Sequence, residues 1–258
     1  MIKASFISTK FSPFIYVFLL TLIGTTIGLL DATIVTAAES IVSKLPSKTI
    51  FKLPPKGAPG PRTDSGSRDA CPATSIGLTA IVPGKNVGQT LSDRPTIWAY
   101  VPFQATSKHQ MEIEIKKPGS NASTITPLPL PQAPGIIQIP LPSDVPAMKV
   151  GDRYTWVLRY NCDVKGESVT NFVQGSIDRI SLNAKFRQYL TNAKTIEEKI
   201  ELYTEYGIWF ELIELLISEK IKDPNDKLIN KIWIDLLSQT PEIDLKEMIN
   251  QPINLQRK

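Results

Sequence analysis

Proline is distributed unevenly along this chain, and its distribution limits what the chain can fold into. Sixteen of the 21 prolines lie between Pro54 and Pro146, and only three follow residue 146. Because proline fixes φ and lacks a backbone donor, the stretch from Pro54 to Pro146 cannot form long helices. After about residue 181 the pattern changes, and apolar residues recur at helical spacing. We therefore expect a β-rich part followed by a helical part.

The composition is that of a globular protein and excludes several kinds of chemistry. The 258 residues are 42% hydrophobic, which is enough for a buried core. His109 is the single histidine, so multi-histidine metal centres are excluded and a His-dependent triad has one candidate base. The formal net charge is +4, without a run of five or six like charges, which does not favour a nucleic-acid partner. We expect no metal and no cofactor.

The beginning of the chain has the order of a secretory signal peptide. Lys3 and Lys10 precede an apolar run over 14–30, and small residues follow up to Ala38. We expect cleavage after Ala38, with Ala37 as the alternative, and a periplasmic or extracellular location. The apolar run just reaches the lower limit for spanning a bilayer, so an uncleaved membrane anchor is the other interpretation.

Two cysteines, Cys71 and Cys162, follow the export signal. In an exported chain two cysteines have one possible intramolecular pairing, so we expect a Cys71–Cys162 disulfide. Two buried free thiols are the alternative. The bond would close a loop of about 90 residues, and the chain-entropy model gives about 4 kcal/mol of stabilisation for a loop of that length.

The pattern divides the chain into four parts. We expect a signal peptide over 1–38, an extended arm rich in proline and glycine over 39–70, a β-sandwich domain over 71–180 and a helical region over 181–258. The third part contains short segments with strand character, at 76–82, 96–103, 111–116, 135–141, 153–162 and 168–180. Short strands separated by turn residues predict an antiparallel, immunoglobulin-like β-sandwich. The fold class is therefore α+β.

The helical region carries clear start and stop signals. Thr195 with Glu198 three residues later matches a capping box, and Gly207 is placed to end the helix that follows. A further helix is predicted over 208–220, and the pair at 223–224 (Asp-Pro) opens the next. These helices predict a hairpin or small bundle that packs on the sandwich or on a partner, because a lone hairpin cannot bury both of its faces.

Aromatic residues in the predicted strands offer a core and a binding interpretation. Trp156, Tyr160 and Cys162 alternate onto one strand face, as in a sandwich core. Trp98 and Tyr100 are candidate binding aromatics that can stack on sugar rings. Core packing is the preferred interpretation for Trp98 and Tyr100, because large aromatic side chains are mostly buried. We also place Trp98 and Tyr100 on opposite faces of their strand, where they cannot form one binding platform.

Five short motifs, taken together, point to a family. They lie at 57–60 (GAPG), 68–71 (RDAC), 91–102 (LSDRPTIWAYVP), 153–156 (RYTW) and 202–209 (LYTEYGIW). The combination resembles a cyanobacterial family of exported proteins that is classed as a domain of unknown function. The resemblance implies a β-rich core with a helical C-terminal tail and no established activity. Since genes of related proteins often lie near extracytoplasmic sensory receptors, it also implies an accessory role beside such a sensor.

Residues suited to catalysis are scarce, so we expect a non-catalytic interaction module rather than an enzyme. His109 lies in a polar loop, and no nucleophile elbow accompanies it. Loop aspartates can ligate calcium, but turn chemistry explains them better. They are Asp64, Asp69, Asp93 and Asp163.

The expected partner is an envelope or receptor protein, and membrane contact is expected only if the signal segment is uncleaved. The candidate surfaces are a sandwich edge, which can take up a peptide by β-augmentation, the proline-rich loop over 127–146 and the exposed side of the helical hairpin. An envelope glycan-binding module or a glycan-acting enzyme is the alternative function, and glycan is then the partner.

Overall fold

The computed structural model describes residues 48–63, 71, 76–106, 109–117, 119–120, 122–164, 166–240 and 248–255. The predicted signal peptide lies outside them. The elements below belong to the compact unit Thr49–Lys258. They are β1 (Thr79–Ala80), β2 (Val87–Thr90), β3 (Thr96–Val101), β4 (Gln110–Lys116), β5 (Ser123–Leu128), β6 (Gly135–Pro140), β7 (Arg153–Val164), β8 (Glu167–Arg179), α2 (Ala184–Asn192), α3 (Ile196–Tyr206), α4 (Trp209–Lys222), α5 (Lys227–Leu237) and β9 (Ile253–Asn254).

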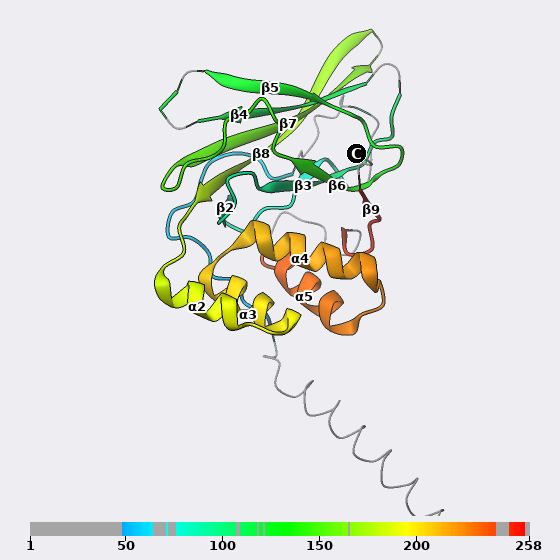
Figure 1. Cartoon of the computed structure of the whole chain (residues 1–258). Helices are drawn as coiled ribbons and strands as arrows, with labels where there is room; N and C mark the ends of the chain where they lie inside the picture. Colours follow the sequence, from blue (N-terminus) through cyan, green and yellow to red (C-terminus); the bar gives the residue numbers. More distant parts are fainter. Residues whose placement is uncertain are drawn as a thin grey trace, which may run out of the picture. The chain divides into compact units, whose positions relative to one another are not determined.

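The strands form two sheets, one with the order β1-β3-β6-β9 and one with the order β2-β8-β7-β4-β5 (Figure 1). Their packing, followed by four described helices, confirms the α+β class and the sandwich-like core. The prediction of a purely antiparallel sandwich was wrong, because β2 pairs with β8 and β9 pairs with β6 in parallel. Both pairings join strands far apart in sequence, where no hairpin turn sets the direction. The immunoglobulin-like topology is not confirmed by these strand orders.

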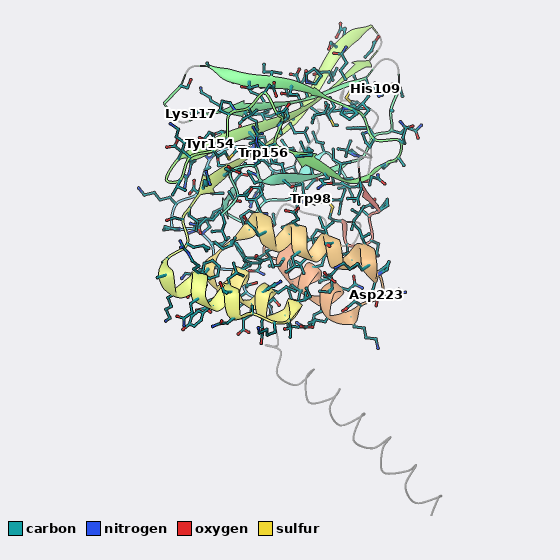
Figure 2. All side chains as sticks on the ribbon, in the orientation of Figure 1. Trp98, His109, Lys117, Tyr154, Trp156 and Asp223 are labelled. Atoms are coloured by element: carbon teal, nitrogen blue, oxygen red, sulfur yellow. A yellow bond between two sulfur atoms is a disulfide. The ribbon has the colours of Figure 1, made fainter. Side chains whose placement is uncertain are left out.

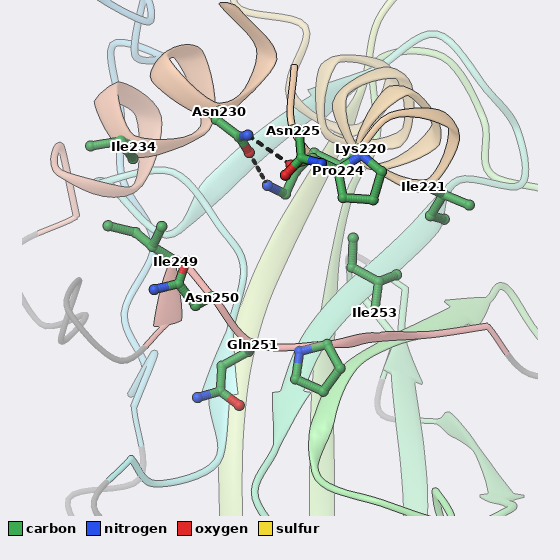
Figure 3. A pocket seen from close by; sticks show the side chains of 11 residues that line it. Lys220, Ile221, Pro224, Asn225, Asn230, Ile234, Ile249, Asn250, Gln251 and Ile253 are labelled. Atoms are coloured by element: carbon green, nitrogen blue, oxygen red, sulfur yellow. Dashed lines mark hydrogen bonds between the residues drawn. The ribbon is translucent and has the colours of Figure 1, made fainter. Parts of the chain in front are cut away.

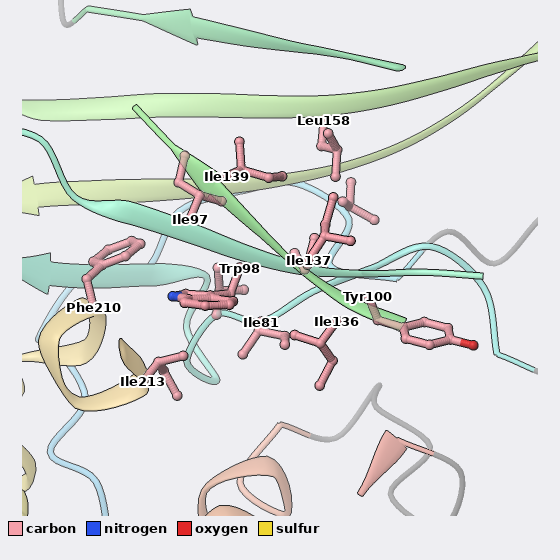
Figure 4. Packing of buried hydrophobic residues seen from close by; sticks show 14 of the residues in the cluster. Ile81, Ile97, Trp98, Tyr100, Ile136, Ile137, Ile139, Leu158, Phe210 and Ile213 are labelled. Atoms are coloured by element: carbon pink, nitrogen blue, oxygen red, sulfur yellow. The ribbon is translucent and has the colours of Figure 1, made fainter. Parts of the chain in front are cut away.

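β3 of the four-stranded sheet lies between the five-stranded sheet and the helices (Figure 1), while β2, at the edge of the five-stranded sheet, contacts α4 directly. All six residues of β3 are buried as a result. Ile97 of β3 points toward Leu158 of β7, whereas Trp98 points toward Phe210 and Ile213 of α4 (Figure 4). A strand covered on both faces has no polar face, which is why the segment reads as a nearly continuous apolar run.

The five-stranded sheet has one buried face and one face that is more open to solvent. In β4 the apolar residues Met111, Ile113 and Ile115 are buried, while the residues between them are partly exposed. This alternation confirms the half-buried strand predicted over 111–116. Trp156 of β7 is fully buried on the inner face, inside the β core (Figure 2).

Local signals place two of the helices, α3 and α5. Thr195 and Glu198 form the predicted capping box at the start of α3, and Gly207 ends that helix in the left-handed conformation with φ of 72°. The predicted start of the next helix, at the Asp-Pro pair over 223–224, was too early in the chain. The helix α5 begins after Asp226, whose side chain accepts hydrogen bonds from the backbone N–H groups of Leu228 and Ile229. The carboxylate two residues after the Asp-Pro pair is the better N-cap, because it can reach both of these amides.

The described part of the predicted N-terminal arm, residues 48–63, covers sheet edges. The carbonyl of Arg62 accepts a hydrogen bond from Ala80 of β1, and that of Pro61 accepts one from Gln174 of β8, both at 2.7 Å. Nearer the N-terminus, the backbone N–H of Lys52 donates to the carbonyl of Thr204 in α3. The arm therefore satisfies backbone groups that an uncovered edge would expose.

Candidate functional site

The two candidate binding aromatics are buried in this structure. Trp98 is 3% and Tyr100 is 5% exposed. Both lie on the face of β3 that is turned toward the helices (Figure 4), so their placement on opposite faces was wrong; residues two apart in a strand share a face. A sugar ring can stack on Trp98 only if α4 moves away from the sheet.

The predicted disulfide is present, and the single histidine lies near it. Cys71 and Cys162 are bonded, with their Cα atoms 5.7 Å apart. Two residues before Cys162, the hydroxyl of Tyr160 lies 2.5 Å from Nδ1 of His109. The Tyr160 ring also stacks on Phe103 with 4.1 Å between centroids, and burial raises its pKa to about 12. His109 thus bonds to a buried phenol at one end of the β core (Figure 2).

The loop aspartates do not come together around a cation site in the described part of the chain. Asp163 accepts a hydrogen bond from the backbone N–H of Gly166 and so closes the turn between β7 and β8. Asp64 and Asp69 lie outside the described residues. Within the residues the structure covers, no cluster of three or more His, Cys, Asp or Glu side chains is placed to hold a metal ion. In that same part, no helix is both long and apolar enough to span a bilayer.

A groove of about 640 Å³ lies where the end of α4, the start of α5 and the segment before β9 meet (Figure 3). Its volume falls within the range of small-ligand sites. We name it the amide groove, because four carboxamide side chains line it. Its described lining residues are Lys220, Ile221, Pro224, Asn225, Asn230, Ile234, Ile249, Asn250, Gln251, Pro252 and Ile253.

Hydrogen bonds fix the polar side of the amide groove. The Lys220 amine, in the last turn of α4, donates to Oδ1 of Asn230 in α5. The Asn230 amide in turn donates to the carbonyl of Pro224 at 2.9 Å (Figure 3). The loop between the helices is held by Asp223, whose carboxylate accepts from the backbone N–H of Asn225, and by the cap at Asp226. Two carboxylates that accept from backbone N–H groups thus fix the short loop, and the loop holds the Lys220 amine and the Asn230 amide in place.

Lys220 differs from the lysines near it in its electrostatic surroundings. Lys222 pairs with Glu219 and Lys231 pairs with Asp235, each at 2.8 Å. Lys220 has no carboxylate within ion-pair distance among the described residues; its hydrogen-bond acceptor is the neutral amide of Asn230. Burial lowers the pKa of Lys220, because leaving water disfavours the charged form. The groove therefore holds an ammonium group without a neutralising anion from its described lining.

The other side of the amide groove is aliphatic. Ile221 of α4 is 43% and Ile234 of α5 is 40% exposed, while Ile249 and Ile253 are partly buried. The segment that carries the last two is held against β6, because the backbone N–H of Ile136 donates to the carbonyl of Pro252 at 2.8 Å. Exposed aliphatic side chains beside fixed polar groups are typical of a site that binds a partly apolar ligand.

The amide groove was not predicted from the sequence. Its described lining comes from two stretches, 220–234 and 249–253, and the second of these is held by the pairing of β9 with β6. The exposed side of the helical hairpin was a predicted surface, and the helical half of the groove belongs to it. Lys220 was the one signal in the sequence that could have indicated the groove. Among the positions one helical turn away from it (216, 217, 223 and 224), only Asp223 is acidic, so few carboxylates are available to pair with its amine.

The fold and the groove define an α+β protein with two packed sheets and a helical layer that carries a small-ligand-sized groove. Comparison with family models then identifies it further: the family described as Domain of Unknown Function (DUF928) matches residues 63–253. The chain belongs to this family, and the resemblance to a domain-of-unknown-function family is confirmed at that level. Comparison with curated proteins found no match.

Proposed function

We propose that this protein is an exported, non-catalytic interaction module that binds an envelope or receptor protein through the amide groove. The observation that carries the proposal is the composition of the groove, which joins one amine and four carboxamides to a wall of isoleucines. Carboxamides donate and accept hydrogen bonds but exchange no proton near neutral pH. Such a lining is suited to holding and orienting a ligand.

Two further observations support the exported location. The segment over 1–38 has the order of a signal peptide. The disulfide between Cys71 and Cys162 fits an oxidising compartment, because such bonds are rare where glutathione keeps thiols reduced. A place beside an extracytoplasmic sensor is the partner environment that we favour, on the resemblance of the motifs.

Site-directed photo-cross-linking in the cells that produce the protein tests this proposal. A photoreactive phenylalanine analogue at Ile221 lies on the groove wall, and the same analogue at Tyr189 on α2 is the matched control, because both side chains are 43% exposed. We expect one envelope or receptor protein to be captured reproducibly from position 221 and to be absent from position 189. Capture of the same proteins from both positions, or of none, would contradict binding at the groove.

A second candidate is a glycan-binding module, and the same carboxamides favour it. Asn225 and Asn250 are exposed at the groove and can donate to and accept from sugar hydroxyls. Retention of the purified protein on isolated cell-wall polysaccharide, lost on changing Asn225→Ala, is the expected result for this candidate. Retention that is unchanged in that variant would place glycan binding elsewhere or count against it.

A further inference from the structure

We infer that the amide groove binds the free C-terminal end of a polypeptide, with the terminal carboxylate on Lys220 and an apolar last side chain against the isoleucines. This inference rests on the proposed function and names the chemistry that the groove recognises.

The described lining carries one positive charge, which a ligand with one negative charge can neutralise. Lys220 is the sole charged residue among the described residues that line the groove, and its acceptor is a neutral amide. An ammonium group has three donors, so two remain after the bond to Asn230. A carboxylate matches both the single charge and the two donors. A bound carboxylate would also offset the burial that disfavours the charged amine.

The apolar wall favours a carboxylate on an aliphatic group over a small inorganic anion. Ile221, Ile234, Ile249 and Ile253 line the same groove as the amine, from three different segments of the chain. Burying aliphatic surface on these side chains contributes roughly 25 cal/mol per Å² of area removed from water. Phosphate offers no such surface, and its second charge would find no cation in the described lining.

The remaining groups of the groove fit a peptide rather than a free fatty or amino acid. Asn225 and Asn250 offer carboxamides that can pair with peptide N–H and C=O groups. β9, which contributes Ile253, is the last strand of the four-stranded sheet, so its second edge is not paired with another described strand. Capture of a terminal carboxylate beside main-chain hydrogen bonds is a known mode of peptide recognition.

Binding of matched synthetic peptides tests this inference on the purified protein with its disulfide intact. The probes are fluorescently labelled tetrapeptides that end in leucine, one as the free acid and one as the C-terminal amide. We expect the free acid to bind at least about tenfold more tightly than the amide, because a charge-assisted hydrogen bond is lost with the carboxylate. Equal affinities, or no binding of either peptide, would overturn the inference.

Three lysine variants assign the effect to the groove. Lys220→Met keeps the length of the side chain but removes the charge, and it should abolish the preference for the free acid. Lys220→Arg should retain the preference, and Lys222→Met is the matched control, since that neighbouring lysine is 66% exposed and already paired with Glu219. A preference that survives Lys220→Met, or competition by inorganic phosphate as strong as by the free-acid peptide, would also overturn it. Thermal unfolding of each variant verifies that it is folded.

The outcomes separate this inference from the proposed function. Capture of an envelope protein from position 221 together with equal binding of acid and amide would leave the interaction module standing and remove the C-terminal specificity. A preference for the free acid together with capture of no protein from position 221 would show the reverse: a carboxylate site without the proposed partner.

Discussion

Glu211, in the first turn of α4, accepts a hydrogen bond of 2.8 Å from the hydroxyl of Thr90 at the end of β2. The same carboxylate oxygen accepts from the backbone N–H groups of Leu91 and Ser92, at 2.8 and 3.1 Å. One carboxylate therefore joins the turn after β2 to the helical layer, 121 positions later in the chain. Arg94 continues the turn by donating to the carbonyl oxygens of residues 142 and 145.

Changing Glu211→Ala should lower the free energy of unfolding by about 2–3 kcal/mol, because three partly buried donors lose a charged acceptor. Glu211→Gln keeps one acceptor oxygen and should cost about 1 kcal/mol. Urea unfolding followed by tryptophan fluorescence measures both. Glu201→Ala, at an exposed position of α3, is the control and should stay within about 0.5 kcal/mol of the parent. An equal loss of unfolding free energy in Glu211→Ala and Glu201→Ala would contradict the role of Glu211 in joining the turn after β2 to α4.

Gly175 makes room for the most buried tryptophan of the β core. It pairs directly with Trp156 across β7 and β8, and a Cβ added at Gly175 would lie 2.6 Å from the Trp156 ring. Gly175→Ala should therefore destabilise the protein by about 1–3 kcal/mol through overpacking, as measured by urea unfolding. Ser168→Ala, at an exposed position of the same strand, is the control. A loss no larger than that of the control would mean that the ring has room to shift.

The features that the sequence predicted well are those that depend on near neighbours in the chain. The alternation of Met111, Ile113 and Ile115 locates one face of β4, and the Thr195–Glu198 box locates the start of α3, because period and capping act within a few residues. The disulfide followed from there being two cysteines and one pairing. Each of these predictions needs no knowledge of the rest of the fold.

The features that were missed depend on contacts between distant segments. The parallel pairing of β2 with β8 brings Val87 beside Ser176, and no local turn signals it. The layer of helices over β3 buries Trp98 and Tyr100 on one face, whereas the sequence analysis favoured core packing but placed them on opposite faces. The amide groove likewise requires the pairing of β9 with β6 to bring Ile253 near Lys220. In all three cases, contacts between segments far apart in the chain determine the structure, and local sequence patterns do not reveal them.

Glu114 gives the stability a dependence on pH in the acid range. The Ser123 hydroxyl and then Arg159, at 2.5 Å, bond its carboxylate and hold its pKa below the ordinary value of 4.5. A pKa lowered by folding stabilises the protein above the unfolded-state pKa, and this contribution is lost as the pH falls through the folded-state value.

Glu114→Gln should therefore reduce the free energy of unfolding by about 1 kcal/mol at pH 7, and the difference from the parent should shrink as the pH falls below 4.5. Urea unfolding at a series of pH values measures it. Glu112→Gln is the matched control on the same strand face, because its contact with Arg159 is longer, at 3.7 Å, and it should change stability less. A difference between Glu114→Gln and the parent that is constant from pH 7 to 3 would contradict the assignment.

The disulfide should supply a large part of the stability of the β core. Cys71 and Cys162 are 91 residues apart, so their bond restricts the unfolded chain over that whole loop. We expect Cys71→Ser with Cys162→Ser to lower the free energy of unfolding by about 4 kcal/mol in the chain-entropy model. Reduction of the parent with dithiothreitol should produce the same shift in the urea midpoint and should leave the double variant unchanged. A double variant as stable as the oxidised parent would show that packing around Tyr160 and Cys162 holds this end of the core without the covalent bond.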